Sequence, residues 1–265
     1  MICNTTNPTS FDPALNMARQ SLYRLCAVSL LDPRAGAWEQ LSHIDSRTPL
    51  EAAAFLRQFP HTVADSLGLG ERPLAELNPE PLFARLPGSA EELNDVYERT
   101  FGLLVSNACP PYESEYIDSK YTFQRSNTLA DVSGFYRAFG LTTSDWHPER
   151  QDHVVLELEF MAFLLAHERR AAELSDPRHQ EYAEICRRAQ ARFLREHLAW
   201  WTPVFAKLLG RENPGGFYDT VGRLLAALIP AERALLGVEV PTAAMPPVPS
   251  MVERPEACEG CELVS

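Results

Sequence analysis

The sequence predicts an all-α fold: a single globular helical domain of roughly eight to ten helices over residues 1–237. The apolar residues include 34 Leu and 31 Ala but only 14 Val and 5 Ile. Leu and Ala are better helix formers than β-branched residues, which are stiff in a helix. Helix-capping signals recur along the chain, and no segment shows the convincing polar–apolar alternation of a strand.

Three capping signals mark helices in the first hundred residues. Asp12 precedes Pro13, an arrangement typical of a first helical turn. The run Thr48-Pro49-Leu50-Glu51 forms a capping box and predicts a helix that continues to about Phe59. A second capping box, Ser89-Ala90-Glu91-Glu92, predicts the next helix.

The middle of the chain interrupts the helical pattern. Residues Asn107 to Phe123 contain Cys109-Pro110-Pro111-Tyr112-Glu113 and predict an ordered loop. We then expect Thr128 to cap a helix that ends at Gly140, since glycine is the usual residue just after a helix.

The remaining helices follow from apolar periodicity and from proline. A long helix is predicted from about Arg150 to about Leu174, and another begins at Pro177. Trp200-Trp201-Thr202-Pro203 is expected to interrupt this helix, and Pro230 to stop the last one. Residues 238–265 contain five prolines and no apolar period, which predicts a flexible tail.

Charge and motifs exclude several functional classes. The formal net charge of -12 disfavours nucleic acid as a partner and would attract a basic peptide, although it also serves solubility alone. We expect no membrane insertion and no secretory signal, and the scattered cysteines favour a reducing cytoplasm. No phosphate-binding loop, HExxH or GxSxG motif occurs. An enzyme is therefore not predicted, and no cofactor is expected.

The pair Cys258 and Cys261 has the CxxC spacing that can hold a metal through two thiolates. A second pair, which a four-ligand site requires, is missing from the sequence. The two cysteines could complete a site in a partner or act as a redox pair, and they could equally be two reduced thiols in a tail.

A polar run, Glu149-Arg150-Gln151-Asp152-His153, lies where the long helix is predicted to begin. Its acidic residues suit the positive end of a helix dipole, which is a purely local role. Alternatively, Asp152 could pair with an arginine of a ligand and His153 could hydrogen-bond to a backbone. Farther along, Glu157 and Glu159 cannot share a face, so one of them is expected near buried surface.

Four segments in register resemble one family, the TorD/DmsD/NarJ chaperones of molybdoenzyme maturation. The resemblance covers about residues 90–230. It looks closest to the chaperones of type II dimethyl sulfoxide reductase-like enzymes. The matching segments are Cys109 to Tyr116, Leu129 to Leu141, Glu149 to Met161, and Arg192 to Leu198 with Trp201 and Pro203.

The resemblance implies an all-α cytoplasmic protein that binds the twin-arginine signal peptide of a molybdenum-containing catalytic subunit precursor and assists insertion of its cofactor before export. One position departs from the family pattern: Arg150 stands where some relatives have proline, so a rigid turn is in doubt there. The residues that match the family's client-binding region are Tyr97, Phe101, Tyr112, Glu113, Glu149, Asp152 and His153.

The expected binding surface combines carboxylates with an aromatic groove. Carboxylates would hold the guanidinium groups of the peptide, and its apolar stretch would lie on Tyr97, Phe101, Tyr112 and Tyr116. A stable accessory subunit of a redox complex and a metal-handling protein remain as alternatives, and the chain could be a monomer or a homodimer. Glu232 is expected on a distant part of the surface.

Overall fold

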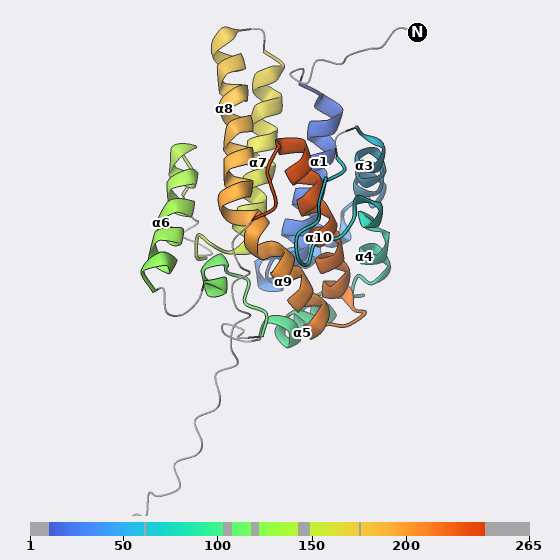
Figure 1. The fold of residues 1–265 in the computed structure, drawn as a ribbon. Coiled ribbons are helices and arrows are strands. Elements are labelled where there is room, and N and C mark those ends of the chain that lie inside the picture. The colour runs from blue at the N-terminus through green and yellow to red at the C-terminus, as the bar shows by residue number, and fades with distance from the viewer. Residues whose placement is uncertain are drawn as a thin grey trace, which may run out of the picture.

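The computed structural model describes residues 11–60, 62–102, 108–117, 122–142, 149–174 and 176–241. It confirms the predicted all-α class, because the described residues form helices and a single isolated β-bridge. Short 3₁₀ turns occur at Pro33–Ala35, Leu74–Glu76 and Glu113–Tyr116. The α-helices are α1 (Pro13–Leu30), α2 (Ala37–Ser42), α3 (Arg47–Gln58), α4 (Glu80–Ala84), α5 (Ala90–Phe101), α6 (Thr122–Ala138), α7 (Val154–Ala172), α8 (Pro177–Phe193), α9 (Ala199–Glu212) and α10 (Phe217–Leu236) (Figure 1).

Local capping explains several of the helix starts. The Asp12 carboxylate accepts hydrogen bonds from the first backbone N–H groups of α1, and the Ser89 hydroxyl accepts one in α5. The predictions that Thr48 and Thr128 cap helices are wrong. Helix α3 begins at Arg47, so Thr48 lies inside it. Helix α6 begins at Thr122, so Thr128 also lies inside a helix.

The predictions that Pro203 interrupts a helix and that Pro230 stops one are both wrong. Pro203 lies within α9 and Pro230 within α10. The interruption after α8 is a π-helical turn, Leu194–Leu198, which precedes the tryptophan pair. Pro230 is tolerated because α10 is buried around most of its surface, and this burial offsets the lost backbone hydrogen bond.

The core lies where α1, α7, α9 and α10 pack together, with α8 against α7 and α3 against α1 (Figure 1). Helices α9 and α10 approach closely at Gly222. A Cβ atom placed there would lie 2.5 Å from the backbone oxygen of Ala206. Glycine is therefore required for this helix contact.

Two buried ion pairs tie distant segments together. Arg19 of α1 donates two hydrogen bonds, of 2.8 and 2.7 Å, to the carboxylate of Glu232 in α10. Glu232 is fully buried, so its expected surface position is wrong. Arg233 forms a 2.6 Å ion pair with Glu71 from the segment that precedes Leu74–Glu76.

The end of the described chain continues beyond α10. Val238 is buried and its N–H donates to the carbonyl of Arg233. The predicted tail lies outside the described residues from position 242 onward, together with Cys258 and Cys261. Within the described part, no cluster of three or more metal-binding side chains occurs. None of the described helices has both the length and the apolar character needed to cross a membrane.

Candidate functional site

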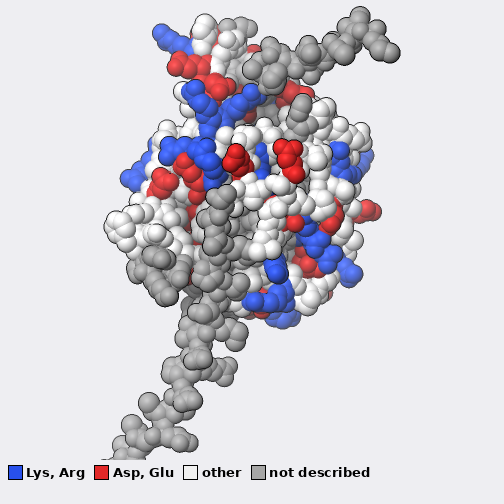
Figure 2. Space-filling model, viewed as in Figure 1, with Lys and Arg blue, Asp and Glu red and all other residues white. Residues whose placement is uncertain are grey.

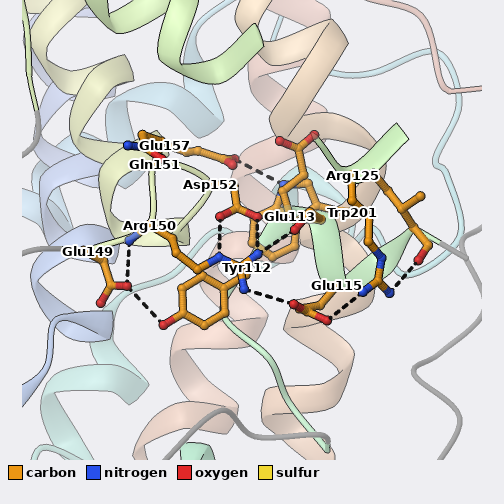
Figure 3. Close-up of polar contacts among 12 residues, drawn as sticks. Tyr112, Glu113, Glu115, Arg125, Glu149, Arg150, Gln151, Asp152, Glu157 and Trp201 are labelled. Atoms are coloured by element: carbon orange, nitrogen blue, oxygen red, sulfur yellow. Dashed lines mark hydrogen bonds and ion pairs between the residues drawn. The ribbon is translucent and has the colours of Figure 1, made fainter. Parts of the chain in front are cut away.

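The predicted loop and the predicted polar run lie against each other. Tyr112 and His153 form an isolated antiparallel bridge, and the N–H of Glu113 donates to the carbonyl of Asp152 at 2.9 Å. Because His153 is in this bridge and residues 150–153 form a turn, α7 begins at Val154 and not at the expected Arg150. The side chains that meet here form the polar cluster: Tyr112, Ser114, Glu115, Glu149, Arg150, Asp152 and His153. Figure 3 shows Tyr112, Glu115, Glu149, Arg150 and Asp152 side by side.

Asp152 forms the base of the polar cluster and is fully buried. Its carboxylate accepts a hydrogen bond from the backbone N–H of Ser114 at 3.0 Å. It also accepts two hydrogen bonds from the guanidinium of Arg150, at 3.1 and 2.9 Å. Asp152 is therefore paired with an arginine of the chain itself, and its pairing with an arginine of a ligand stays a prediction.

Arg150 closes the polar cluster on its outer side. Its guanidinium donates to Glu115 at 3.0 Å and to the Ser114 hydroxyl at 2.6 Å, and it lies 4.2 Å from the centre of the Tyr112 ring. Burial lowers the pKa of Arg150, but the neighbouring carboxylates of Asp152 and Glu115 outweigh burial and raise it. Arg150 is therefore a permanent cation, and its side chain is 36% exposed.

Glu115 and Glu149 lie at the accessible rim. Glu115 pairs with Arg150 and also with Arg125 of α6, so it connects that helix to the polar cluster. Glu149 accepts hydrogen bonds from the hydroxyl of Tyr112 at 3.1 Å and from the backbone of Arg150. Burial and the charge of Glu149 raise the pKa of Tyr112 to about 12, so its hydroxyl remains a donor.

His153 has a structural role at the start of α7. Its Nδ1 accepts a hydrogen bond from the backbone N–H of Val155, within the chain itself. Its ring packs edge-on against Tyr112 with 5.1 Å between the ring centres. Burial lowers the pKa of His153, although the charges of Glu149, Asp152 and Asp32 oppose this effect.

A second layer of buried polar groups lies beneath the loop. Glu113 accepts a 2.7 Å hydrogen bond from the indole of Trp200 and lies 3.0 Å from Nδ1 of His197. Glu157 is also fully buried and accepts a bond from Trp201, whereas Glu159 is exposed, which confirms that only one of the two acids faces inward.

Burial and the nearby charges of Glu113 and Asp152 raise the pKa of Glu157 well above its usual value. Burial disfavours the ionised form of a carboxyl, and a neighbouring acidic group disfavours it further.

The expected aromatic groove is wrong. Tyr97, Phe101 and Tyr116 are buried in the core, and only Tyr112 is partly exposed. Tyr97 and Phe101 stack on each other with 4.7 Å between their ring centres, and Tyr116 packs on Trp201. These rings stabilise the fold around the polar cluster and do not form an open surface.

Sequence reasoning missed several members of the site. In the sequence Arg150 stands out only as a departure from a family pattern, and nothing there marks it as the partner of Asp152. His197 and Trp200 were not connected to Glu113, because the π-helical turn that places His197 beneath the loop has no strong local signal. A buried carboxylate requires a partner, and that requirement was the available clue.

Comparison with known proteins identifies the family. A family model described as nitrate reductase delta subunit matches residues 72–207, which include the whole polar cluster. The chain belongs to this family. Among the described residues, the family match also includes α4 to α8 and the π-helical turn, whereas α1, α2 and α3 precede it.

Several similar proteins are named as chaperones. The chain is 37% identical to the selenate reductase assembly chaperone protein of Thauera selenatis, over 44% of this chain and 57% of the relative. It is 35% identical to the chlorate reductase assembly chaperone protein of Ideonella dechloratans, over 43% and 55%. It is 25% identical to the chaperone protein TorD of Aliivibrio salmonicida, over 50% and 59%. The chain thus spans little more than half the length of these relatives.

Proposed function

We propose that this chain is a maturation chaperone, not an enzyme, and that it acts in the cytoplasm as a monomer or homodimer. Its client would be the precursor of a molybdenum-containing catalytic subunit of the dimethyl sulfoxide reductase family. The chaperone would bind the twin-arginine signal peptide of that precursor and assist insertion of the molybdenum cofactor before export. The names of the relatives, two of them assembly chaperones of reductases and one a chaperone, support this proposal.

The observation that carries the proposal is the chemistry of the polar cluster. The cluster already holds one guanidinium, that of Arg150, between carboxylates and an aromatic ring. Arginine forms paired, charge-assisted hydrogen bonds in such surroundings, whereas lysine is only a point charge. Glu115 and Glu149 are partly exposed beside it, so their free lone pairs can accept bonds from a second arginine.

The long-range field assists encounter with a basic peptide. The net charge of -12 attracts a cationic segment. Figure 2 shows basic and acidic side chains interspersed on the face in view, with no extended area of one sign. The general negative charge therefore steers the peptide, and the local geometry of the polar cluster selects arginine.

The test is a calorimetric titration with two synthetic peptides. One contains two adjacent arginines followed by an apolar stretch of Leu and Ala, and the other replaces both arginines with lysines. We expect the arginine peptide to bind about tenfold or more tightly, which corresponds to about 1.4 kcal/mol. Equal affinities, or no binding of either peptide, would contradict the proposal.

A matched pair of variants locates the binding to the rim. Glu149→Gln should weaken binding of the arginine peptide by about 1–3 kcal/mol, the range for a lost hydrogen bond to a charged group. Glu39→Gln, an identical change at an exposed position of α2, should leave the affinity unchanged.

One observation favours a second candidate function. The matching family is described as a nitrate reductase delta subunit, which is also compatible with a stable accessory subunit of a redox complex. An accessory subunit would remain bound to the mature enzyme, whereas a chaperone would leave it. Co-purification with the mature enzyme in fixed stoichiometry would therefore favour this alternative.

A further inference from the structure

Arg150 differs from the arginines of the two buried ion pairs. The side chains of Arg19 and Arg233 are enclosed together with the glutamates that they neutralise, and they are only 7% and 4% exposed. The carboxylate of Asp152 is just as buried, but the Arg150 side chain that neutralises it is 36% exposed. A buried carboxylate is therefore reached from solvent here, and a guanidinium of another molecule can approach it by the same route.

The groups around the Arg150 guanidinium match that group on several sides (Figure 3). Its Nε and one terminal nitrogen donate to the two oxygens of Asp152, which is the paired geometry of guanidinium and carboxylate. Its terminal nitrogens also donate to Glu115 and to the Ser114 hydroxyl. The face of the Tyr112 ring lies 4.2 Å from the guanidinium carbon. Together these contacts select a planar cation with several N–H donors, which is an arginine side chain and not an ammonium group.

The surrounding groups are held by contacts that do not involve the Arg150 side chain. The backbone N–H of Ser114 donates to the Asp152 carboxylate, and backbone hydrogen bonds join the loop to the polar run. Glu115 also pairs with Arg125 of α6. A vacated site therefore keeps much of its shape, which lowers the cost of binding a second guanidinium there.

We propose that the position of the Arg150 guanidinium is a binding site for an arginine of the client, and that Arg150 is the internal competitor that closes this site in the free chaperone. The inference rests on the proposed function and adds a regulation to the same polar cluster. The client's arginine takes over the bonds to Asp152, and the displaced Arg150 side chain turns into solvent. The buried carboxylate is paired before and after the exchange, so no uncompensated buried charge remains.

The short tether of Arg150 sets a threshold for the ligand. A competitor on a short flexible tether acts at an effective concentration on the order of millimolar, so an isolated arginine of another protein displaces it poorly. A peptide with two adjacent arginines has a second contact available, because Glu149 at the rim is only partly buried. The internal arginine thereby excludes single arginines and admits paired ones.

The first experiment titrates wild type and Arg150→Lys with the synthetic arginine and lysine peptides. Lysine keeps the positive charge beside Asp152 but cannot form the paired hydrogen bonds. We expect Arg150→Lys to bind the arginine peptide about threefold or more tightly than wild type, because the internal competitor occupies the site for a smaller fraction of the time. The lysine peptide does not fit the opened site, so its affinity should stay unchanged. Arg47→Lys, the same change at an exposed ion pair of α3, is the control and should bind both peptides as wild type does.

The second experiment tests the vacated site without a peptide. Arg150→Ala removes the equivalent of ethylguanidinium, so ethylguanidinium is the probe and ethylammonium its control. At about five times its dissociation constant, ethylguanidinium should raise the melting temperature of Arg150→Ala by about 2–4 °C, with saturation. Ethylammonium should give no such rise, and Arg47→Ala should not respond to either compound.

The outcomes separate the inference from the proposed function. If the folded Arg150→Ala variant shows no rise specific to ethylguanidinium, the inference is overturned. If that variant does not fold, the titration of Arg150→Lys decides, and an affinity for the arginine peptide equal to that of wild type overturns the inference while the proposed function stands. If wild type and both variants bind neither peptide, the proposed function fails, and the client's arginine fails with it as the ligand of this site.

Discussion

Replacement of Arg150 by alanine is expected to destabilise the protein although this side chain is partly exposed. The change leaves the fully buried carboxylate of Asp152 with the backbone N–H of Ser114 as its remaining protein donor. Removal of one partner from a fully buried ion pair costs about 3–5 kcal/mol. The Arg150 side chain is 36% exposed, so water can reach the vacated space. We therefore expect Arg150→Ala to lower the free energy of unfolding by about 2–3 kcal/mol.

The assay is urea unfolding followed by circular dichroism, with a double-mutant cycle. Asp152→Asn removes the buried charge, so Arg150→Ala should cost less in that background. The expected coupling energy is about 1–3 kcal/mol. The control is Arg47→Ala, since Arg47 pairs with Asp45 on the open surface and should contribute no measurable stability. If Arg150→Ala is as stable as the Arg47 variant, Arg150 does not neutralise a buried charge and the reasoning fails.

Three further changes test other parts of the structure by the same unfolding measurement. Glu157→Gln should lose less stability than wild type as the pH rises above the usual glutamate pKa of about 4.3. The pKa of Glu157 is raised in the folded protein, so the unfolded chain releases this proton more readily and the stability of wild type falls as the pH rises. Parallel pH profiles would contradict this. Gly222→Ala should lower the free energy of unfolding by about 1–3 kcal/mol, because the added Cβ collides with the Ala206 backbone. An unchanged free energy of unfolding would refute that close contact. Glu232→Gln should cost about 3 kcal/mol by leaving Arg19 without an ionised partner, and wild-type stability would show that the pair is not needed.

The features of the fold that depend on neighbouring residues could be predicted from the sequence. Asp12 and Ser89 cap helices through bonds within a few residues, and Gly140 has the positive φ expected just after α6. The wrong predictions depend on distant contacts. Thr128 resembles a cap, but α6 extends to Thr122, and Pro230 resembles a stop, but α10 continues because its surroundings bury it.

The two segments that form the candidate site could be predicted from the sequence, but the contacts between their side chains could not. The loop around Tyr112 and the polar run ending at His153 were both recognised, and the structure brings them together. The sequence could not show that Asp152 is already paired with Arg150, because this depends on the bend that precedes α7. The sequence also could not separate exposed aromatic residues from core ones. Tyr116, for example, is buried, but a tyrosine occurs equally well in a core or on a binding surface.

The most direct test of the central claim is capture of partners from the native host, grown under conditions that induce respiratory enzymes. The tagged full-length chain is isolated under mild conditions, and its partners are identified by mass spectrometry with coverage of their N-termini. The account predicts a molybdenum-containing catalytic subunit that still carries its twin-arginine signal, and a marked loss of this partner with Glu149→Gln. Capture of only the mature, processed enzyme, in equal amounts with wild type and variant, would contradict it.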